Sequence, residues 1–347
     1  MEFLDNTSRE IYNNLVDFNK NSDYESLVKA IELNGVTADR MYRQRIEIEK
    51  QLKAGKKLVL YGLGADANRY LMDEKKHKNS MGYNYITWFG DIDWYRYCDK
   101  TVKEFNGKEV GTVEELLEEE GEYVFYIAAS TQILEITKYL VSCGVDVNNI
   151  YQFRYYGTEV YDEKQYIDSF LEVKDEDIVI DAGAYTCDFT ERFINWNKGK
   201  YKRIYAFEPD KENYDIAVKN MEQYENVEVV NSAVGEVSTS VSFMSKEGAG
   251  SGINENGNST VEVVALDDMN LDKVSFIKLD VEGFELDTLK GGINTIKKYR
   301  PRMAICLYHK INDIIDIPKF IEELDLGYKY YLRIYSNTYL EIVLYCI

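Results

Sequence analysis

Apolar positions in the first 55 residues recur at the spacing of an α-helix. In Tyr24–Leu33 and Met41–Leu52 they fall three or four residues apart, which places them on one helical face. Residues 1–55 are therefore expected to form a helical segment. Its apolar faces favour a packing layer or a dimer contact, so a homodimer through this N-terminal region is an expected assembly.

The next hundred residues alternate between apolar runs and amphipathic stretches. The run Leu58–Tyr61 leads into a turn at Gly62 and Gly64, after which a helical pattern begins. Further elements are expected at Tyr83–Phe89 (strand), Thr112–Glu120 (helix), Tyr123–Ala128 (strand) and Thr131–Cys143 (helix). This alternation predicts a small Rossmann-like α/β domain over residues 56–154.

A second alternation covers residues 175–347. Its apolar runs predict strands at Ile178–Ile180, Arg203–Phe207, Val227–Val230 and Val274–Leu279. Apolar strands separated by helical patterns are typical of a parallel sheet covered on both faces. The runs Lys329–Tyr335 and Tyr339–Ile347 predict a C-terminal antiparallel hairpin. Residues 155–174, polar and helical in pattern, are the expected linker between the two domains.

Charge and composition exclude several classes of protein. The 347 residues carry 61 acidic and 41 basic side chains, a net charge of -20, so nucleic acid is not an expected partner. The chain has no signal-peptide pattern and no long apolar run, which predicts a cytoplasmic protein without membrane contact. The five scattered cysteines fit neither a disulfide framework nor a zinc site. Two histidines exclude a histidine-rich metal centre, while oxygen ligands for a divalent cation remain allowed.

Acidic side chains follow the first two strands of the second domain. Asp181 and Gly183 lie in the turn after the first strand, and Glu208 follows the second. Ligands of open α/β sheets bind at this edge, where a carboxylate can accept hydrogen bonds from ribose hydroxyls. The turn GAYT lacks the glycines of a pyrophosphate cradle, so a ligand with a ribose and no phosphate is favoured, such as S-adenosylmethionine. An ordinary βα turn with Asp181 as a helix cap is the alternative.

The fourth strand carries charges that an apolar strand does not favour. Lys278 lies inside it, and Asp280 and Glu282 follow at two-residue spacing, so the three share one face if the strand continues. Such a cluster favours a site over a structural ion pair. His309, just beyond the fifth strand, has an ordinary pKa near neutrality and is a second candidate base. The hypothesis is that Asp280 and Glu282 form a catalytic acidic pair that His309 assists.

The motifs DAGAYTCDF, FEPD, NSAVG, VVALDD, FIKLDVEGFELDTLKGG and YRP, in this order, resemble the FkbM family of S-adenosylmethionine-dependent methyltransferases. The resemblance covers about half of the chain, from residue 175. It implies a class I methyltransferase sheet with a C-terminal antiparallel hairpin, and O-methylation of a hydroxyl on a sugar, glycan or related small metabolite. Tyr185 and Cys187 stand where the family often has Asn and Gly.

The resemblance also assigns residues to roles. Asp181, Gly183 and Ala184 would line the methionine part of the cofactor, Glu208 would hold its ribose, and Asp280 and Glu282 would face the transferred methyl group. The full set expected around the cofactor is Asp181, Gly183, Ala184, Tyr185, Thr186, Glu208, Pro209, Asn231, Ser232 and Ala233. The expected catalytic set is Lys278, Asp280, Glu282 and His309. A divalent cation on the carboxylates is a further option.

The smaller domain resembles the nucleotide-sugar-binding domain of bacterial sugar acyltransferases. The resemblance rests on the motif YGLG, the acidic pair Asp91 and Asp93, and the run YVFYIAAS. Two alternatives to methyl transfer follow. YGLGADA could bind a nicotinamide cofactor in an NAD-dependent oxidoreductase, or the chain could be a non-catalytic cofactor- or nucleotide-sugar-binding module in glycan assembly. The Gly- and Asn-rich segment Ser245–Ser259 is expected to be a loop beside the active site, either a substrate lid or a plain hairpin connection.

Overall fold

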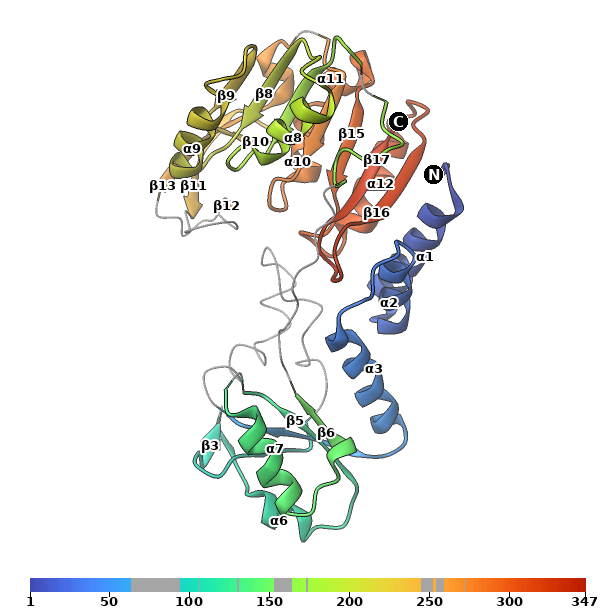
Figure 1. Ribbon diagram of the computed structural model, residues 1–347, viewed down its shortest axis with the longest axis vertical. Helices are drawn as coiled ribbons and strands as arrows, with labels where there is room; N and C mark the ends of the chain where they lie inside the picture. The colour runs from blue at the N-terminus through green and yellow to red at the C-terminus, as the bar shows by residue number, and fades with distance from the viewer. Residues whose placement is uncertain are drawn as a thin grey trace. The chain divides into compact units, whose positions relative to one another are not determined.

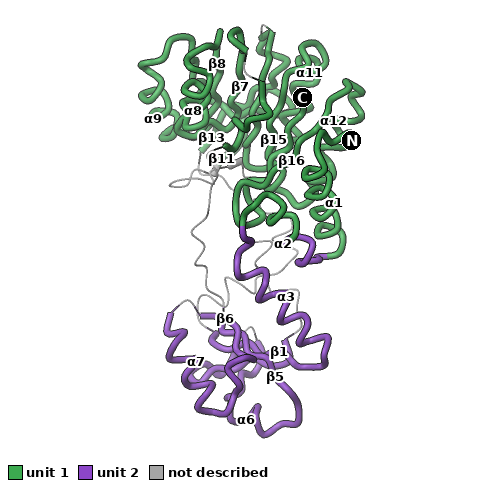
Figure 2. Tube along the Cα trace, turned by 45° about the vertical axis from the view of Figure 1, so that its right-hand side comes forward, with its two compact units in different colours: residues 1–21, 29–36, 159–347 green, residues 22–28, 37–158 purple. Residues whose placement is uncertain are grey.

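The computed structural model of the protein describes residues 1–63, 94–105, 107–129, 131–152, 164–172, 174–244, 252–253, 259–271 and 273–347. The chain forms two compact units (Figure 2). Unit 1 comprises residues 1–21, 29–36 and 159–347, and unit 2 comprises residues 22–28 and 37–158. The N-terminal helical segment therefore contributes to both units. Among the described residues, no helix is long and apolar enough to cross a membrane.

Unit 2 is built on a four-stranded sheet whose strands all run parallel, in the order β2-β1-β5-β6. Its elements are α3 (Arg40–Lys53), β1 (Lys57–Tyr61), β2 (Arg96–Cys98), β3 (Glu104–Phe105), β4 (Lys108–Glu109), α6 (Val113–Leu117), β5 (Tyr123–Ile127), α7 (Ile133–Ser142) and β6 (Ile150–Gln152). Helix α2 (Tyr24–Glu32) is divided between the units. The parallel α/β architecture predicted for this region is confirmed.

Alternate residues of β1 point to opposite faces of this sheet, which is why the strand is apolar throughout. Leu58 and Leu60 pack in one core with Ile48 of α3. Val59 packs in a second core with Leu140 of α7. Both faces of the sheet are thus covered by helices.

Several sequence-based expectations fall outside the described residues. They are the strand at Tyr83–Phe89, the turn residue Gly64 and the helix after it, the acidic pair Asp91 and Asp93, and most of the loop Ser245–Ser259.

Unit 1 contains the larger sheet. Its elements are α1 (Asn6–Asn21), β7 (Ile178–Ala182), α8 (Asp188–Trp196), β8 (Arg203–Phe207), α9 (Lys211–Met221), β9 (Val227–Val230), β10 (Ala233–Val234), β11 (Thr239–Met244), β12 (Gly252–Ile253), β13 (Ser259–Val264), β14 (Phe276–Leu279), α10 (Glu285–Gly291), α11 (Ile293–Tyr299), β15 (Arg302–Cys306), α12 (Asp313–Glu323), β16 (Tyr330–Ile334) and β17 (Ile342–Cys346).

The seven-stranded sheet of unit 1 has the order β16-β17-β15-β14-β7-β8-β9. Five neighbouring strands, β15 to β9, run parallel, and β17 pairs antiparallel with both β15 and β16. Figure 1 shows the β16–β17 hairpin at one edge of this sheet and β9 at the other. The predicted parallel sheet with a C-terminal antiparallel hairpin is confirmed. A smaller sheet has the order β10-β13-β11-β12.

Helices cover this sheet because its central strands are buried on both faces. On one face Phe189 and Phe193 of α8 pack against Phe276 of β14. At the hairpin edge α1 packs beside β16, and the N-terminus joins the sheet through a bridge between Phe3 and Tyr330. The first residues of the chain are therefore part of the C-terminal unit.

The helix expected in the linker is wrong for residues 164–172, which form turns. Tyr166 has a φ of +66°, a left-handed conformation that interrupts a helix. Its side chain is buried in the core of unit 1 together with Leu171. Contacts with the sheet, and not the local helical pattern, determine the conformation of this segment.

Candidate active site

The registers of three neighbouring strands bring the predicted site residues to one edge of the large sheet. Ala182 of β7 is paired with Phe207 of β8 and with Leu279 of β14. The residues that follow, Gly183, Glu208 and Asp280, therefore lie next to one another at the carboxyl ends of the strands. Ligands bind at this edge in open α/β sheets.

The turn after β7 requires glycine at its first position. Gly183 has a φ of +77°, and a Cβ there would lie 1.7 Å from the carbonyl oxygen of Asp280. Tyr185 and Cys187 also have positive φ values, of 51° and 67°. Asn and Gly, which the family often has there, adopt this conformation at lower energetic cost. The turn therefore keeps a tightly bent backbone although two of its residues are poorly suited to it.

Glu208 presents a buried carboxylate at this edge. Its Oε2 accepts a hydrogen bond from the backbone N–H of Tyr185 at 2.8 Å, and its Oε1 accepts one from that of Asp210 at 2.8 Å. Burial raises the pKa of Glu208 to about 7, and Asp210 adds to this effect, while the two backbone N–H groups and Lys278 oppose it. The two backbone N–H groups thus fix the position of the Glu208 carboxylate. Additional hydrogen-bond donors would favour its charged form.

The other residues expected around the cofactor surround Glu208 or continue the same edge. Asn231 donates from Nδ2 to the carbonyl oxygens of Glu208 (2.9 Å) and Pro209 (3.1 Å). Ser232 is buried, and its Oγ has no hydrogen-bond partner among the described residues. Ala184 is buried, the Tyr185 side chain is exposed, Thr186 donates to Asp188 at 2.8 Å, and Ala233 begins β10.

Asp181 and Lys278 form a buried ion pair, with Oδ1 and Nζ 3.1 Å apart. Asp181 also accepts a hydrogen bond from Thr190 at 2.7 Å, and Lys278 donates to the carbonyl oxygen of Gly183 at 2.6 Å. Burial alone would lower the pKa of Lys278, but Asp181 and Asp280 outweigh it and raise the pKa. Asp181 and Lys278 thus pair with each other and hold the turn after β7, while their expected roles, lining the cofactor and taking part in catalysis, stay predictions.

Two tyrosine hydroxyls donate to the carboxylate of Asp280 at this edge. Its Oδ2 accepts from the hydroxyl of Tyr166 at 2.9 Å, and its Oδ1 accepts from that of Tyr308 at 3.2 Å. Burial would raise its pKa, but Lys278 and then His309, together with the Tyr166 hydrogen bond, lower it overall. Asp280 is therefore ionised at neutral pH.

Glu282 does not share a strand face with Lys278 and Asp280. Strand β14 ends at Leu279, and Glu282 has a φ of +53° in the turn that follows. The two-residue alternation assumed from the sequence stops before it. The turn nevertheless brings the Glu282 carboxylate close to His309, with Oε2 3.9 Å from Nε2.

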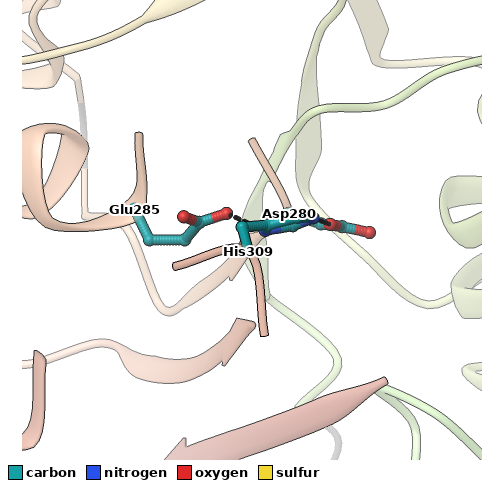
Figure 3. A group of neighbouring side chains, drawn as sticks. All are labelled: Asp280, Glu285 and His309. Atoms are coloured by element: carbon teal, nitrogen blue, oxygen red, sulfur yellow. Dashed lines mark hydrogen bonds and ion pairs between the residues drawn. The ribbon is translucent and has the colours of Figure 1, made fainter. Parts of the chain in front are cut away.

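His309 is enclosed by carboxylates. Its Nδ1 lies 2.7 Å from Glu285 Oε1, and its Nε2 lies 3.4 Å from Asp280 Oδ1 (Figure 3). Burial alone would lower the pKa of His309, but Glu285, Asp280 and Glu282 raise it to about 10. The expectation that His309 titrates near neutrality is thus wrong. Without another cation in the site, these carboxylates favour the protonated imidazole, and the assisting role of His309 stays a prediction.

Sequence reasoning missed four contributors to the site. Glu285 lies in the motif FIKLDVEGFELDTLKGG, and Tyr308 directly precedes His309. Tyr166 reaches Asp280 across 114 positions of sequence. Glu341, between β16 and β17, accepts a hydrogen bond from Gln165, and burial and the charge of Asp280 raise its pKa to about 7. No periodic pattern signals the last two, because long-range packing alone brings them to the sheet edge.

The Tyr166 contact gives a testable prediction. Replacing Tyr166 with Phe removes one hydrogen bond to a charged group, a loss of about 1.5 kcal/mol, and should lower turnover about tenfold. The affinity for the methyl donor should stay unchanged, since Tyr166 contacts Asp280 and not the Glu208 region. Tyr201→Phe, which removes a hydroxyl bonded to the carbonyl oxygen of Glu225 outside the site, is the control. Equal turnover in the two variants would contradict a positioning role.

The strand order, the antiparallel hairpin and the acidic carboxyl edge together define the class I, Rossmann-like methyltransferase fold. The family model of the methyltransferase FkbM domain matches residues 181–330. Residues 181–330 thus match the methyltransferase FkbM domain that the motifs of this region resemble.

Two known proteins are similar over larger parts of the chain. The crystal structure of methyltransferase FkbM from Methylobacillus flagellatus KT aligns with 99% of this chain and 99% of its own, with a TM-score of 0.53 and 16% identity, and shares the fold. A hexuronic acid methyltransferase, AglP, from Haloferax volcanii is 24% identical over 213 residues, which cover 57% of this chain and 82% of the relative.

Proposed function

We propose that the FkbM domain transfers a methyl group from S-adenosylmethionine to a hydroxyl oxygen of a sugar, a glycan or a related small metabolite. The observation that carries this proposal is the buried carboxylate of Glu208, which two backbone N–H groups hold at the carboxyl edge of the sheet. The acceptor class is supported by the similarity to the Haloferax relative, a hexuronic acid methyltransferase.

The residues at the edge fit an adenosyl ligand. Each oxygen of Glu208 accepts one backbone N–H group. Each can accept a further hydrogen bond, as from a ribose hydroxyl. The buried Ser232 Oγ has no partner among the described residues, as expected of a group that bonds a ligand. Glu208 and Ser232 would thus hold the ribose and adenine end, and the turn from Gly183 to Thr186 would line the rest.

O-methylation requires a group that accepts the hydroxyl proton, and the acidic cluster of Asp280 and Glu282 can supply it. When bound, S-adenosylmethionine carries the methyl group on a positively charged sulfur, which keeps the electron pair of the broken carbon–sulfur bond as the acceptor oxygen bonds the carbon. The hydroxyl proton must leave, and Asp280, ionised at neutral pH, can accept it and pass it to solvent. Glu282, half-buried and 3.9 Å from His309 Nε2, is the second member of the proposed acidic pair.

One titration series tests the ligand. We expect isothermal titration calorimetry of the full chain to show binding of S-adenosylmethionine and S-adenosylhomocysteine. NAD binding alone would favour the oxidoreductase alternative, and nucleotide-sugar binding alone would favour the non-catalytic module. Transfer of a labelled methyl group to hexuronic acids and other sugars then tests the acceptor class. The proposal fails if neither sulfur compound binds.

The pKa of Glu208 predicts how donor affinity depends on pH. An ionised carboxylate accepts ribose hydroxyls more strongly than a protonated one, so binding favours the ionised form and lowers a pKa that burial has raised to about 7. Donor affinity should therefore rise with pH, by about tenfold between pH 6 and pH 8 if only the ionised form binds.

Calorimetry in buffers of different ionisation enthalpy measures the proton release that must accompany this binding. Glu208→Gln should bind more weakly and lose the pH dependence. Glu212→Gln, an exposed change on the neighbouring helix α9, should keep both the affinity and the pH dependence. A pH dependence that persists in Glu208→Gln would assign it to another group.

A further inference from the structure

The contacts of His309 divide between its two ring nitrogens. Nδ1 lies 2.7 Å from Glu285 Oε1, a carboxylate oxygen that also accepts the backbone N–H groups of Val281 (2.9 Å) and Gly283 (3.4 Å). Glu285 and His309 are both buried, so these bonds fix the orientation of the imidazole ring. A histidine that ligates a metal almost always has its other nitrogen held by a carboxylate or carbonyl group in this way.

The opposite nitrogen, Nε2, faces two carboxylates without a hydrogen bond in the described part of the chain. Asp280 Oδ1 lies 3.4 Å away and Glu282 Oε2 lies 3.9 Å away. These separations exceed the 2.9 Å or so of a direct N–H···O bond. They approach the roughly 3 to 3.5 Å that separates neighbouring ligand atoms when each lies about 2.1 Å from one ion. Asp280 and His309 also belong, with Glu285, to a group whose potential ligand atoms all lie within 4.8 Å of one another.

Carboxylates gather around His309 in the described part of the chain. Three carboxylates, of Asp280, Glu282 and Glu285, surround one imidazole. Glu285 Oε2 is buried and has no partner among the described residues. Lys278 contributes its charge to Asp280, but its ammonium group is bonded to Asp181 and to the backbone of the turn after β7. Buried charges are stable only when they are paired or bind a metal, so this cluster favours an additional cation.

We propose that His309 Nε2, Asp280 and Glu282 bind a divalent cation, and that Glu285 positions the imidazole for it. The cation takes the place of the proton on Nε2, which is released to solvent. Mixed imidazole and carboxylate ligands suit Mn²⁺ and similar ions, and the half-buried Asp280 and Glu282 leave the site open on one side. The proposal rests on the proposed methyl transfer, in which a cation here would stabilise the charge left on the acceptor oxygen as its proton departs.

Electron paramagnetic resonance of Mn²⁺ titrated into the full, chelator-treated chain tests the site directly. We expect saturable loss of the free Mn²⁺ signal at one equivalent per chain. Glu282→Gln should weaken this binding at least tenfold, because it removes one charged ligand and conserves the shape of the side chain. Calorimetry with S-adenosylmethionine should show unchanged donor affinity in the same variant, which also verifies that it is folded.

Asp313→Asn is the matched control. Asp313 is a buried carboxylate whose pKa burial and Glu285 raise to about 7, and it is not a proposed ligand. If only the overall negative charge attracts Mn²⁺, the two variants lose affinity equally and the ligand assignment is overturned. Absence of Mn²⁺ binding to the wild type, or turnover that a chelator leaves unchanged, also overturns it. Failure to bind S-adenosylmethionine would instead refute the proposed function.

Discussion

Replacing Asp280 with Asn is expected to lower methyl transfer by about 10² to 10⁴, the usual contribution of a positioned proton acceptor. The substitution conserves size, but it removes the charge toward which Tyr166, Tyr308 and His309 all point. An amide can still accept one tyrosine hydroxyl, so the fold of the site should survive. The affinity for S-adenosylmethionine should change little, because Glu208 and Ser232 lie on the other side of β7.

Single-turnover transfer of a labelled methyl group, measured with calorimetric donor binding, separates these two effects. Asp287→Asn, which alters a partly exposed carboxylate of α10 that pairs with Lys290, is the control and should retain turnover. If Asp280→Asn binds the donor and keeps its full turnover, the acidic cluster takes no part in the reaction. Loss of donor binding as well would show that Asp280 contributes to the cofactor site.

The positions of the site residues along the strands could be predicted because parallel strands expose their carboxyl ends at one edge. The bounds of β8 and β9 agree with the apolar runs at Arg203–Phe207 and Val227–Val230. Glu208, which directly follows β8, was therefore placed correctly at the edge. The same argument placed Asp280 and His309 there, since each follows a strand by a few residues.

Side-chain direction could not be predicted in the same way. The alternation rule assumed that β14 continues to Glu282, but the strand ends at Leu279 and the backbone then turns with a positive φ. The sequence signalled that Lys278 needs a partner without identifying Asp181, on a strand almost a hundred positions earlier. Tyr166 was assigned to a helix because a local pattern cannot register its contact with Asp280.

The environment of His309 shows why a residue's ordinary pKa is a weak guide to its role. The sequence places only Lys310 and Tyr308 beside it, whereas the fold surrounds it with carboxylates from the turn after β14 and from α10. Those charges raise its pKa to about 10 and favour the protonated imidazole over the neutral base. Chemical roles at this edge thus depend on tertiary contacts more than on the identity of each residue.

The largest expected loss of stability comes from Lys278→Met. Asp181 is fully buried and lies 3.1 Å from the lysine ammonium, so removing the lysine leaves a buried carboxylate whose one remaining side-chain donor is Thr190. Breaking a buried ion pair in this way costs about 3 to 5 kcal/mol, although methionine fills a similar volume. Urea unfolding of the full chain measures the change in the free energy of unfolding.

Two further variants decide what that loss means. Lys211→Met breaks an exposed ion pair with Asp215 and should cost at most about 0.5 kcal/mol. Combining Lys278→Met with Asp181→Leu removes both buried charges, and should recover more than half of the loss if the cost arises from the unpaired carboxylate. A double variant no more stable than Lys278→Met alone would point instead to the hydrogen bonds of Lys278 with the turn after β7. In that case the ammonium acts mainly by holding Gly183 in place, and the donor affinity of both variants should fall together.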